Sequence, residues 1–193
     1  MNFEYWRHLI RARLFQRLRR SGPAIREYEL ALRHAPDSAR LLNSLAYLHA
    51  GEKRYAEAER LFEQATRRQP GDADALFNLG YVRDQMGKRT EAIEAFGQAV
   101  ALRPALDRAW YGMGLAQAAL GDHESAAAAL EKAAELQPMN GSAWYYLGMA
   151  YHTLRRPEKV ESVIRHLHRF DPKLAHRLIA DAGRSDLAHL IGT

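Results

Sequence analysis

Cysteine is absent from this chain of 193 residues, which excludes disulfide bonds and metal sites built from thiolates. No apolar run approaches the roughly 18 residues that a membrane-spanning helix needs. Basic residues near the N-terminus are followed by no apolar core of about 7–15 residues, the mark of a secretory signal. We therefore expect a cytoplasmic protein.

Negative charge is scarce only at one end of the chain. Residues 1–35 hold eight Lys or Arg and three Asp or Glu, whereas residues 36–193 hold 20 of each sign. The net charge of +5 therefore belongs to the N-terminal segment. A protein that coats nucleic acid along its whole length would spread its basic residues more evenly, so no nucleic acid partner is expected.

Proline is also rare, yet its placement is regular. Of seven prolines, five recur at one constant interval, at Pro36, Pro70, Pro104, Pro138 and Pro172. A period of about 34 residues, repeated along most of a chain, indicates one supersecondary unit copied in series. Because proline lacks the N–H that helices need and clashes with the preceding turn, each of these prolines is predicted to end a helix.

Other positions of this period also recur in type. Two columns are shown by their members: a large one, Leu42, Leu76, Trp110, Trp144, and a small one, Ala46, Gly80, Gly114, Gly148. Large side chains three or four residues apart form the buried stripe of a helix. The small column lets two helix backbones approach closely, and Gly87-Lys88 and Gly121-Asp122 are predicted turns between the paired helices.

The segments 110–114 (WYGMG) and 144–148 (WYYLG), each followed by Ala, an apolar residue, Ala and Pro, resemble the tetratricopeptide repeat. The resemblance implies an all-α fold, a right-handed α-solenoid of helix-turn-helix hairpins with a C-terminal capping helix. We expect a single domain over residues 1–193. Its predicted parts are a divergent helical pair at 3–38, units at 39–72, 73–106, 107–140 and 141–174, and a capping helix and tail at 175–193.

Both ends of the array have distinctive sequences. Residues 3–20 carry an apolar stripe of Phe3, Trp6, Ile10, Leu14 and Leu18 at helical spacing, with arginines on the other face. We interpret this segment as the first helix of the array with a solvated basic face. A second interpretation is contact with an acidic partner or an anionic membrane surface through residues 7–20. A third is contact with nucleic acid phosphates, which no basic groove rich in stacking side chains supports. At the C-terminus, residues 173–182 are predicted to be the capping helix, with Leu187, Leu190 and Ile191 docking back or meeting a partner.

Catalytic chemistry is not indicated by any motif. His166 and His168 are two residues apart on a predicted helix, so their rings point about 200° apart and do not converge on one ion. Asp72 precedes a helix and is predicted to be its N-cap. No nucleophile, base and orienting residue share a motif. We predict that the chain is not an enzyme and has no cofactor and no metal site.

The tetratricopeptide resemblance also implies a binding surface, because in that family the first helices line a concave groove that takes peptide segments of partners. We predict a non-catalytic module that binds a peptide or helical segment of a partner protein there. The alternative is a self-assembling scaffold, and hence a homo-oligomer, or a membrane-peripheral adaptor that uses the Arg-rich helix. Trp110 and Trp144 are expected inside the helix pairs. The candidate groove residues are Arg40, Asn43, Tyr47, Asp74, Phe77, Asn78, Tyr81, Asp84, Arg108, Tyr111, Leu115, Tyr145, Tyr146, Met149 and His152.

Overall fold

The computed structural model describes residues 3–190, and within them it holds α-helices, one short 3₁₀ helix and no strand. This confirms the predicted all-α class. The chain forms two compact units, Met1–Leu102 and Arg103–Thr193, each of which is described by itself. Whether they act as one domain stays a prediction.

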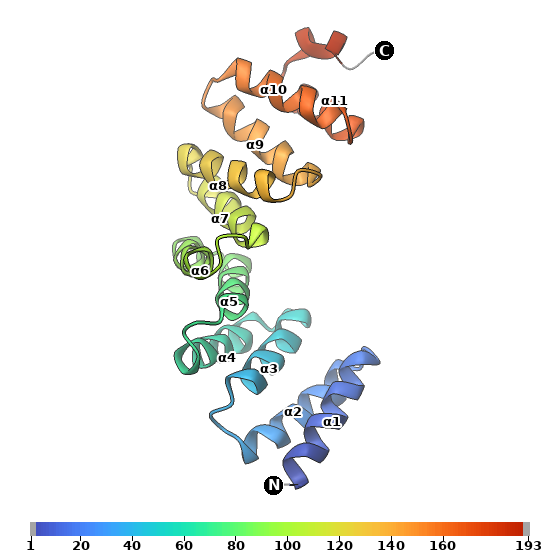
Figure 1. The fold of residues 1–193 in the computed structure, drawn as a ribbon, viewed down its shortest axis with the longest axis vertical. Helices are drawn as coiled ribbons and strands as arrows, with labels where there is room; N and C mark the ends of the chain where they lie inside the picture. The colour runs from blue at the N-terminus through green and yellow to red at the C-terminus, as the bar shows by residue number, and fades with distance from the viewer. Residues whose placement is uncertain (1–2, 191–193) are drawn as a thin grey trace. The chain divides into compact units, whose positions relative to one another are not determined.

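The first unit consists of three helix hairpins (Figure 1). The members of each hairpin run antiparallel, and the second helix of one hairpin packs against the first helix of the next. The six helices are α1 (Phe3–Arg17), α2 (Ser21–His34), α3 (Ala39–Gly51), α4 (Tyr55–Arg68), α5 (Ala73–Gln85) and α6 (Arg89–Leu102).

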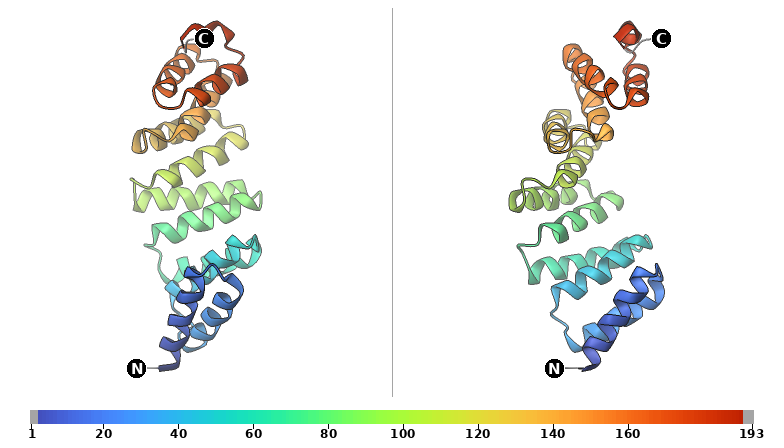
Figure 2. Two further views of the ribbon diagram at one scale, coloured as in Figure 1. Left: turned by 90° about the vertical axis from the view of Figure 1, so that its right-hand side faces the viewer. Right: turned by 45° about the vertical axis from the view of Figure 1, so that its right-hand side comes forward.

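The second unit has two hairpins followed by a further helix and a 3₁₀ turn (Figure 2). Its elements are α7 (Asp107–Ala119), α8 (His123–Leu136), α9 (Gly141–Thr153), α10 (Pro157–His168), α11 (Pro172–Asp181) and η1 (Ser185–Leu190). Helix α11 packs against both α9 and α10 and buries Leu178 completely. Leu187 is also buried, so this residue of the tail docks back on its own unit. The side chain of Leu190 and all of Ile191 lie outside what the structure describes.

Every hairpin turns through the same backbone conformation. Arg19, Lys53, Gly87, Gly121 and Arg155 all have positive φ and occupy a single column of the repeat, whereas Gly183, which also has positive φ, follows α11 outside this column. Glycine, as at Gly87 and Gly121, adopts this left-handed conformation without a steric clash. In a residue with a Cβ, the Cβ approaches the backbone oxygen too closely, which raises the energy of the turn. The turn geometry is therefore set by the position in the repeat, because it persists where the residue is Arg or Lys.

The small column brings the helices of a hairpin close together. A Cβ built on Gly80 would lie 2.7 Å from Phe96 Cδ1 of the paired helix, and one on Gly114 would lie 2.7 Å from Leu130 Cγ. On Gly148 the nearest atom belongs to the capping helix instead, at 2.5 Å from Leu178 Cδ2. The column thus closes hairpins, as predicted, and in the last repeat it also seats α11.

The prolines do not all have the same structural role. Helices α2, α4, α6 and α8 end two residues before Pro36, Pro70, Pro104 and Pro138. Pro172 is different, because α10 ends four residues earlier at His168 and Pro172 itself begins α11. Proline suits the first turn of a helix, where the missing N–H would have no intrahelical partner. The fifth proline therefore starts the capping helix and does not end the helix before it.

Helix α1 packs through a face that the apolar stripe did not predict. Phe3, Trp6, Ile10, Leu14 and Leu18 are all exposed, and the face packed on α2 carries His8, Leu9 and Ala12. Ala12 is fully buried and lies one repeat before Ala46, so it fills the small column. The choice of face follows from a buried polar contact, since unpaired buried charges are costly. His8 Nδ1 lies 2.6 Å from Glu27 Oε2, and Arg11 Nη2 lies 3.1 Å from Glu27 Oε1.

Candidate partner-binding faces

In the first unit the predicted columns expose two tyrosines. Tyr47 on α3 is 60 % exposed and Tyr81 on α5 is 45 % exposed, although most apolar side chains of these two helices are buried. Both belong to one column of the repeat, and α3 and α5 contact each other. A phenol ring offers a large, stiff contact area with a polar tip, so this pair is suited to binding. We call the exposed side of α3 and α5 around Tyr47 and Tyr81 the first-unit face.

Two other residues of these columns, Asn43 and Phe77, make contacts within the first unit. Asn43 Nδ2 donates a hydrogen bond of 3.0 Å to Asp72 Oδ2. The other carboxylate oxygen of Asp72 accepts from the backbone N–H groups of Asp74 and Ala75, which makes Asp72 the N-cap of α5, as predicted. Asn43 therefore ties α3 to the start of α5. Phe77 packs against Phe96, with ring centroids 5.9 Å apart.

In the second unit the columns bring three tyrosines into one aromatic cluster. The ring centroids of Tyr111 and Tyr146 are 6.2 Å apart, and those of Tyr145 and Tyr146 are 5.2 Å apart, both in edge-on geometry. Tyr146 is 42 % exposed. Tyr111 is half-buried, and burial together with the neighbouring Tyr146 raises the pKa of the Tyr111 phenol. We call the exposed side of this cluster the second-unit face.

Tyr145 is mainly a packing residue. Its side chain is buried, its hydroxyl donates a hydrogen bond of 2.6 Å to Asp181 Oδ2, and the Arg177 guanidinium lies 4.9 Å from its ring centroid. Burial, followed by the bond to Asp181, raises the pKa of Tyr145, and the same bond lowers the pKa of Asp181. Tyr145 thus connects the capping helix to α9.

The remaining candidates divide by exposure. Arg40, Arg108 and His152 are exposed, like Tyr47, Tyr81 and Tyr146. The half-buried candidates are Asn43, Asp74, Phe77, Asn78, Asp84, Tyr111, Leu115 and Met149, and Leu115 and Met149 pack against the core of the second unit. Every candidate side chain except Tyr145 is therefore exposed or half-buried. Their contact with a partner stays a prediction.

The two tryptophans of the large column are half-buried, which agrees only partly with the expected place inside the helix pairs. Their indole Nε1 groups donate to backbone oxygens of the preceding turns, Trp110 to Pro104 at 2.8 Å and Trp144 to Pro138 at 2.9 Å. The Trp144 ring also packs on His166, with centroids 4.0 Å apart. Each of these hydrogen bonds connects the turn between two hairpins to the first helix of the second hairpin.

Two surface hollows lie away from the tyrosine columns. One, of about 420 Å³, is in the first unit between α4, α5 and α6 and is lined by Leu76, Leu79 and Ala95 among others. The other, of about 430 Å³, lies between α7 and α8 beside Trp110 and Met113. Within the described part of the chain, no three His, Cys, Asp or Glu side chains gather where they could hold a metal ion.

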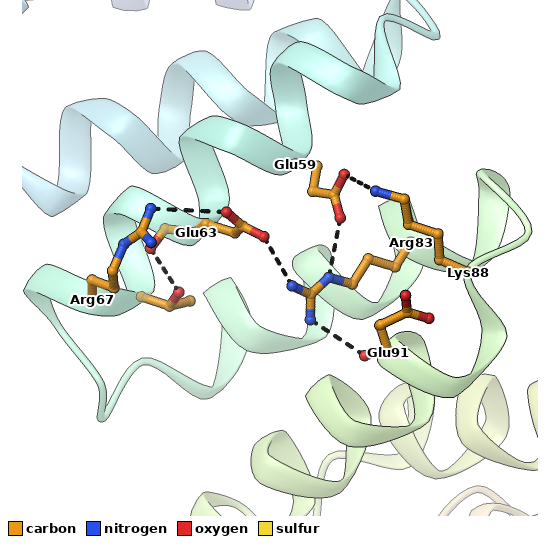
Figure 3. A network of polar contacts seen from close by, with 7 residues as sticks. Glu59, Glu63, Arg67, Arg83, Lys88 and Glu91 are labelled. Carbon is orange, nitrogen blue, oxygen red and sulfur yellow. Dashed lines mark hydrogen bonds and ion pairs between the residues drawn. The ribbon is translucent and has the colours of Figure 1, made fainter.

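A polar network in the first unit was not predicted from the sequence (Figure 3). Arg83 of α5 lies at its centre, with Nε 3.3 Å from Glu59 Oε1 and Nη2 2.9 Å from Glu63 Oε1 of α4. Lys88, in the α5–α6 turn, reaches the second oxygen of Glu59 at 2.6 Å. The network locks one hairpin to the next. Its members are 24, 20 and 29 residues apart in the chain, which no local motif could reveal.

Several proteins of known structure have a similar fold. Structures of similar fold include MamA, with a TM-score of 0.79, 21 % identity, and coverage of 97 % of this chain and 98 % of that one. A MamA structure from Desulfovibrio magneticus RS-1 has a TM-score of 0.79 at 20 % identity, covering 94 % and 98 %. YrrB, described as a tetratricopeptide repeat protein with an unusual peptide-binding site, has 0.78 at 22 % identity, covering 90 % and 88 %. At these identities the likeness shows the fold alone. No curated protein sequence matches the chain.

Two family models decide the assignment. One, described as tetratricopeptide repeat, matches residues 37–105, and a second of the same description matches residues 77–136 and 111–159. Together they span more than half of the chain and include both tyrosine faces. They support a protein-protein interaction module as the class of function. The chain belongs to the tetratricopeptide repeat family.

Proposed function

We propose that this protein is a non-catalytic module that binds a peptide or helical segment of a partner protein along its first helices. The segment would lie in the concave groove that the family fold implies. The observation that carries the proposal is the exposure of Tyr47 and Tyr81, at 60 % and 45 %, on one column of adjacent hairpins. Burying two such rings against a partner would remove a large apolar area from water.

The polar groups beside these tyrosines suit the recognition of a peptide. Asn78 and Asp84 are half-buried on α5, and Arg40 is exposed at the start of α3. Their amide, carboxylate and guanidinium groups can pair with the backbone and side chains of a bound segment. Ser44 is less available, because its hydroxyl donates to the Arg40 carbonyl oxygen at 2.9 Å. Such a face combines apolar anchors with a polar rim, which is the usual anatomy of an interface.

The similar fold of YrrB, which is described as having a peptide-binding site, supports a peptide as the ligand. The second unit offers Tyr146 as its most exposed aromatic side chain in the predicted columns. Tyr145 is left out of this proposal, because it is buried and its hydroxyl is bonded to Asp181. We therefore assign partner contact to Tyr47, Tyr81 and Tyr146.

The proposal is tested with a random peptide library displayed on phage and panned against the whole protein. Selected peptides are then titrated against Tyr47→Ala/Tyr81→Ala, against Tyr146→Ala, and against the matched control Leu102→Ala/Leu120→Ala. The control replaces two side chains that are similarly exposed, at 50 % and 54 %, outside the columns. We expect the tyrosine pair to weaken binding at least about tenfold, because aromatic anchors dominate interface energies.

Tyr146→Ala is expected to weaken only those peptides that reach the second-unit face. Circular dichroism should show native helix content for every variant, because the replaced side chains are exposed. Unchanged affinity in all tyrosine variants would refute the proposed face. A loss that is equal in the control would refute it too, since the effect would not depend on the columns.

A further inference from the structure

The outward side of α1 is an apolar face that no other part of residues 3–190 covers. It consists of Phe3, Trp6, Ile10, Leu14 and Leu18, which are 74 %, 46 %, 62 %, 54 % and 58 % exposed. Eleven large hydrophobic side chains are exposed in the described residues, and these are five of them. They lie opposite the face that packs on α2. We call this set the α1 outer face.

Positively charged side chains flank the α1 outer face. They are Arg7, Arg13 and Arg17, which are exposed and lie next to its apolar residues on the helix surface. Arg7 pairs with Glu4 one turn away, whereas neither Arg13 nor Arg17 forms an ion pair with another residue of the part that the structure describes. Along this side of α1, two guanidinium groups are therefore available to a ligand of negative charge.

From this arrangement we propose that the α1 outer face binds an anionic lipid surface, with the helix lying in the plane of the interface. The apolar side chains would enter the boundary between headgroups and acyl chains, where amphipathic helices lie. Arginine can bury its stem beside them and keep its charge among the lipid phosphates. Across residues 3–190 every helix is too short or too polar to cross a bilayer, so α1 would lie on the membrane and not span it.

Another helix hairpin, stacked before α1 in the register of the repeat, would meet an unfavourable charge at Arg7. Arg7 lies one repeat before Leu41, and the same column continues with Ala75, Ala109 and Ala143. These last four residues are at most 1 % exposed. A hairpin placed before α1 would bury Arg7 at this close contact, and an arginine buried without full compensation is costly.

A second copy of this chain is also disfavoured. In a parallel pair of α1 outer faces, Arg13 and Arg17 of one copy would lie against those of the other, and like charges repel. The capping helix α11 exposes Lys173 and Arg177, of which Arg177 pairs with Asp181 at 3.3 Å. Lys173 is basic and so does not complement the arginines of α1. A lipid surface rich in anionic headgroups complements these arginines in charge.

The test uses the whole protein and sedimentation with vesicles. One set of vesicles contains only phosphatidylcholine, and the other contains equal parts of phosphatidylcholine and phosphatidylglycerol. We expect binding to the anionic vesicles, weak or no binding to the zwitterionic ones, and a loss of binding at high salt because surface charge is screened. Vesicles with brominated acyl chains should quench part of the tryptophan fluorescence, and Trp6→Phe should abolish this quenching because Trp110 and Trp144 lie elsewhere.

Two variants separate the apolar and the charged contributions. Ile10→Ser/Leu14→Ser/Leu18→Ser should lower the partition coefficient more than about 100-fold, because several buried methylene groups are lost. Its matched control is Leu102→Ser/Leu120→Ser/Met139→Ser, at positions 50 %, 54 % and 71 % exposed, and should bind like the wild type. Arg13→Gln/Arg17→Gln should weaken binding about 25-fold, or about fivefold for each arginine. Arg26→Gln/Arg60→Gln, on α2 and α4, is the control for charge.

Three outcomes would overturn the proposal. The first is that no vesicle binds, and the second is that both vesicle types bind equally. The third is a concentration-dependent oligomer that Ile10→Ser/Leu14→Ser/Leu18→Ser dissociates while vesicles remain unbound, which would make the face a contact between copies. Peptide binding through Tyr47 and Tyr81 is measured separately and does not depend on any of these results.

Discussion

Replacing Gly114 by leucine tests how the hairpins of this solenoid close. Gly114 is buried in α7, and a Cβ there would lie 2.7 Å from Leu130 Cγ and 3.2 Å from the carbonyl oxygen of Ala126. Leu130 is fully buried, so it has no free space into which to move. To admit any side chain at Gly114, helices α7 and α8 must therefore move apart or Leu130 must change its rotamer.

The magnitude follows from the size of the added group. Overpacking by extra carbons typically costs about 1–3 kcal/mol, and leucine adds four carbons at a site that a Cβ alone already overfills. Leucine is a better helix former than glycine by somewhat less than about 1 kcal/mol, which offsets part of this cost. We expect the free energy of unfolding to fall by about 2–4 kcal/mol, or the melting temperature by about 5–12 °C. Tyr47→Ala, at an exposed site, should change stability by about 0.5 kcal/mol or less.

Thermal melting followed by circular dichroism provides the measurement. A second comparison isolates the clash itself. Leu130→Ala should destabilise by about 2–5 kcal/mol, and Gly114→Ala should cost less in that background than in the wild type, because the atom closest to the new Cβ, Leu130 Cγ, has gone. If Gly114→Leu were as stable as Tyr47→Ala, the assignment of the small column to close helix packing would be wrong.

Two further predictions concern polar contacts between helices, one within each unit. The pKa of Tyr151 is raised to about 12, first by burial and then by the nearby Glu131 carboxylate. A raised folded-state pKa contributes stability that is complete below the unfolded value of about 10 and is lost as pH rises toward 12. Urea unfolding at about pH 9 and about pH 12 should show a loss on the order of 2 kcal/mol that Tyr151→Phe reduces; an identical pH dependence in the variant would contradict the assignment. Arg83→Met should lower the free energy of unfolding by about 1–3 kcal/mol in urea titrations, because Glu59 and Glu63 lose their shared partner in a partly buried site. Arg60→Met, at an exposed position of α4, is the matched control, and equal effects of the two changes would argue against the network.

The repeat architecture is determined by the sequence because its requirements are local and recur at a fixed interval. Each hairpin needs a residue in the left-handed conformation at one position and a small residue at another. Lys53 meets the first requirement in the same place as Gly87 and Gly121. Ala12 meets the second requirement in frame with Gly80 and Gly114, although the apolar stripe of the same helix predicts that another face is buried.

Only the tertiary structure decided the roles of side chains whose contacts lie far along the chain. Helix α1 has two apolar sides, and a hydrophobic pattern alone does not tell which one is buried. The choice depends on α2, where Glu27 binds His8 and the Tyr28 hydroxyl donates to Gln16 Oε1 at 2.7 Å. Tyr145 and Tyr146 are neighbours in one motif, yet Tyr145 bonds to Asp181, 36 residues further on, while Tyr146 remains exposed. The sequence by itself therefore determined the helical repeat and the turns within its hairpins, and contacts between hairpins decided which side chains are left to meet a partner.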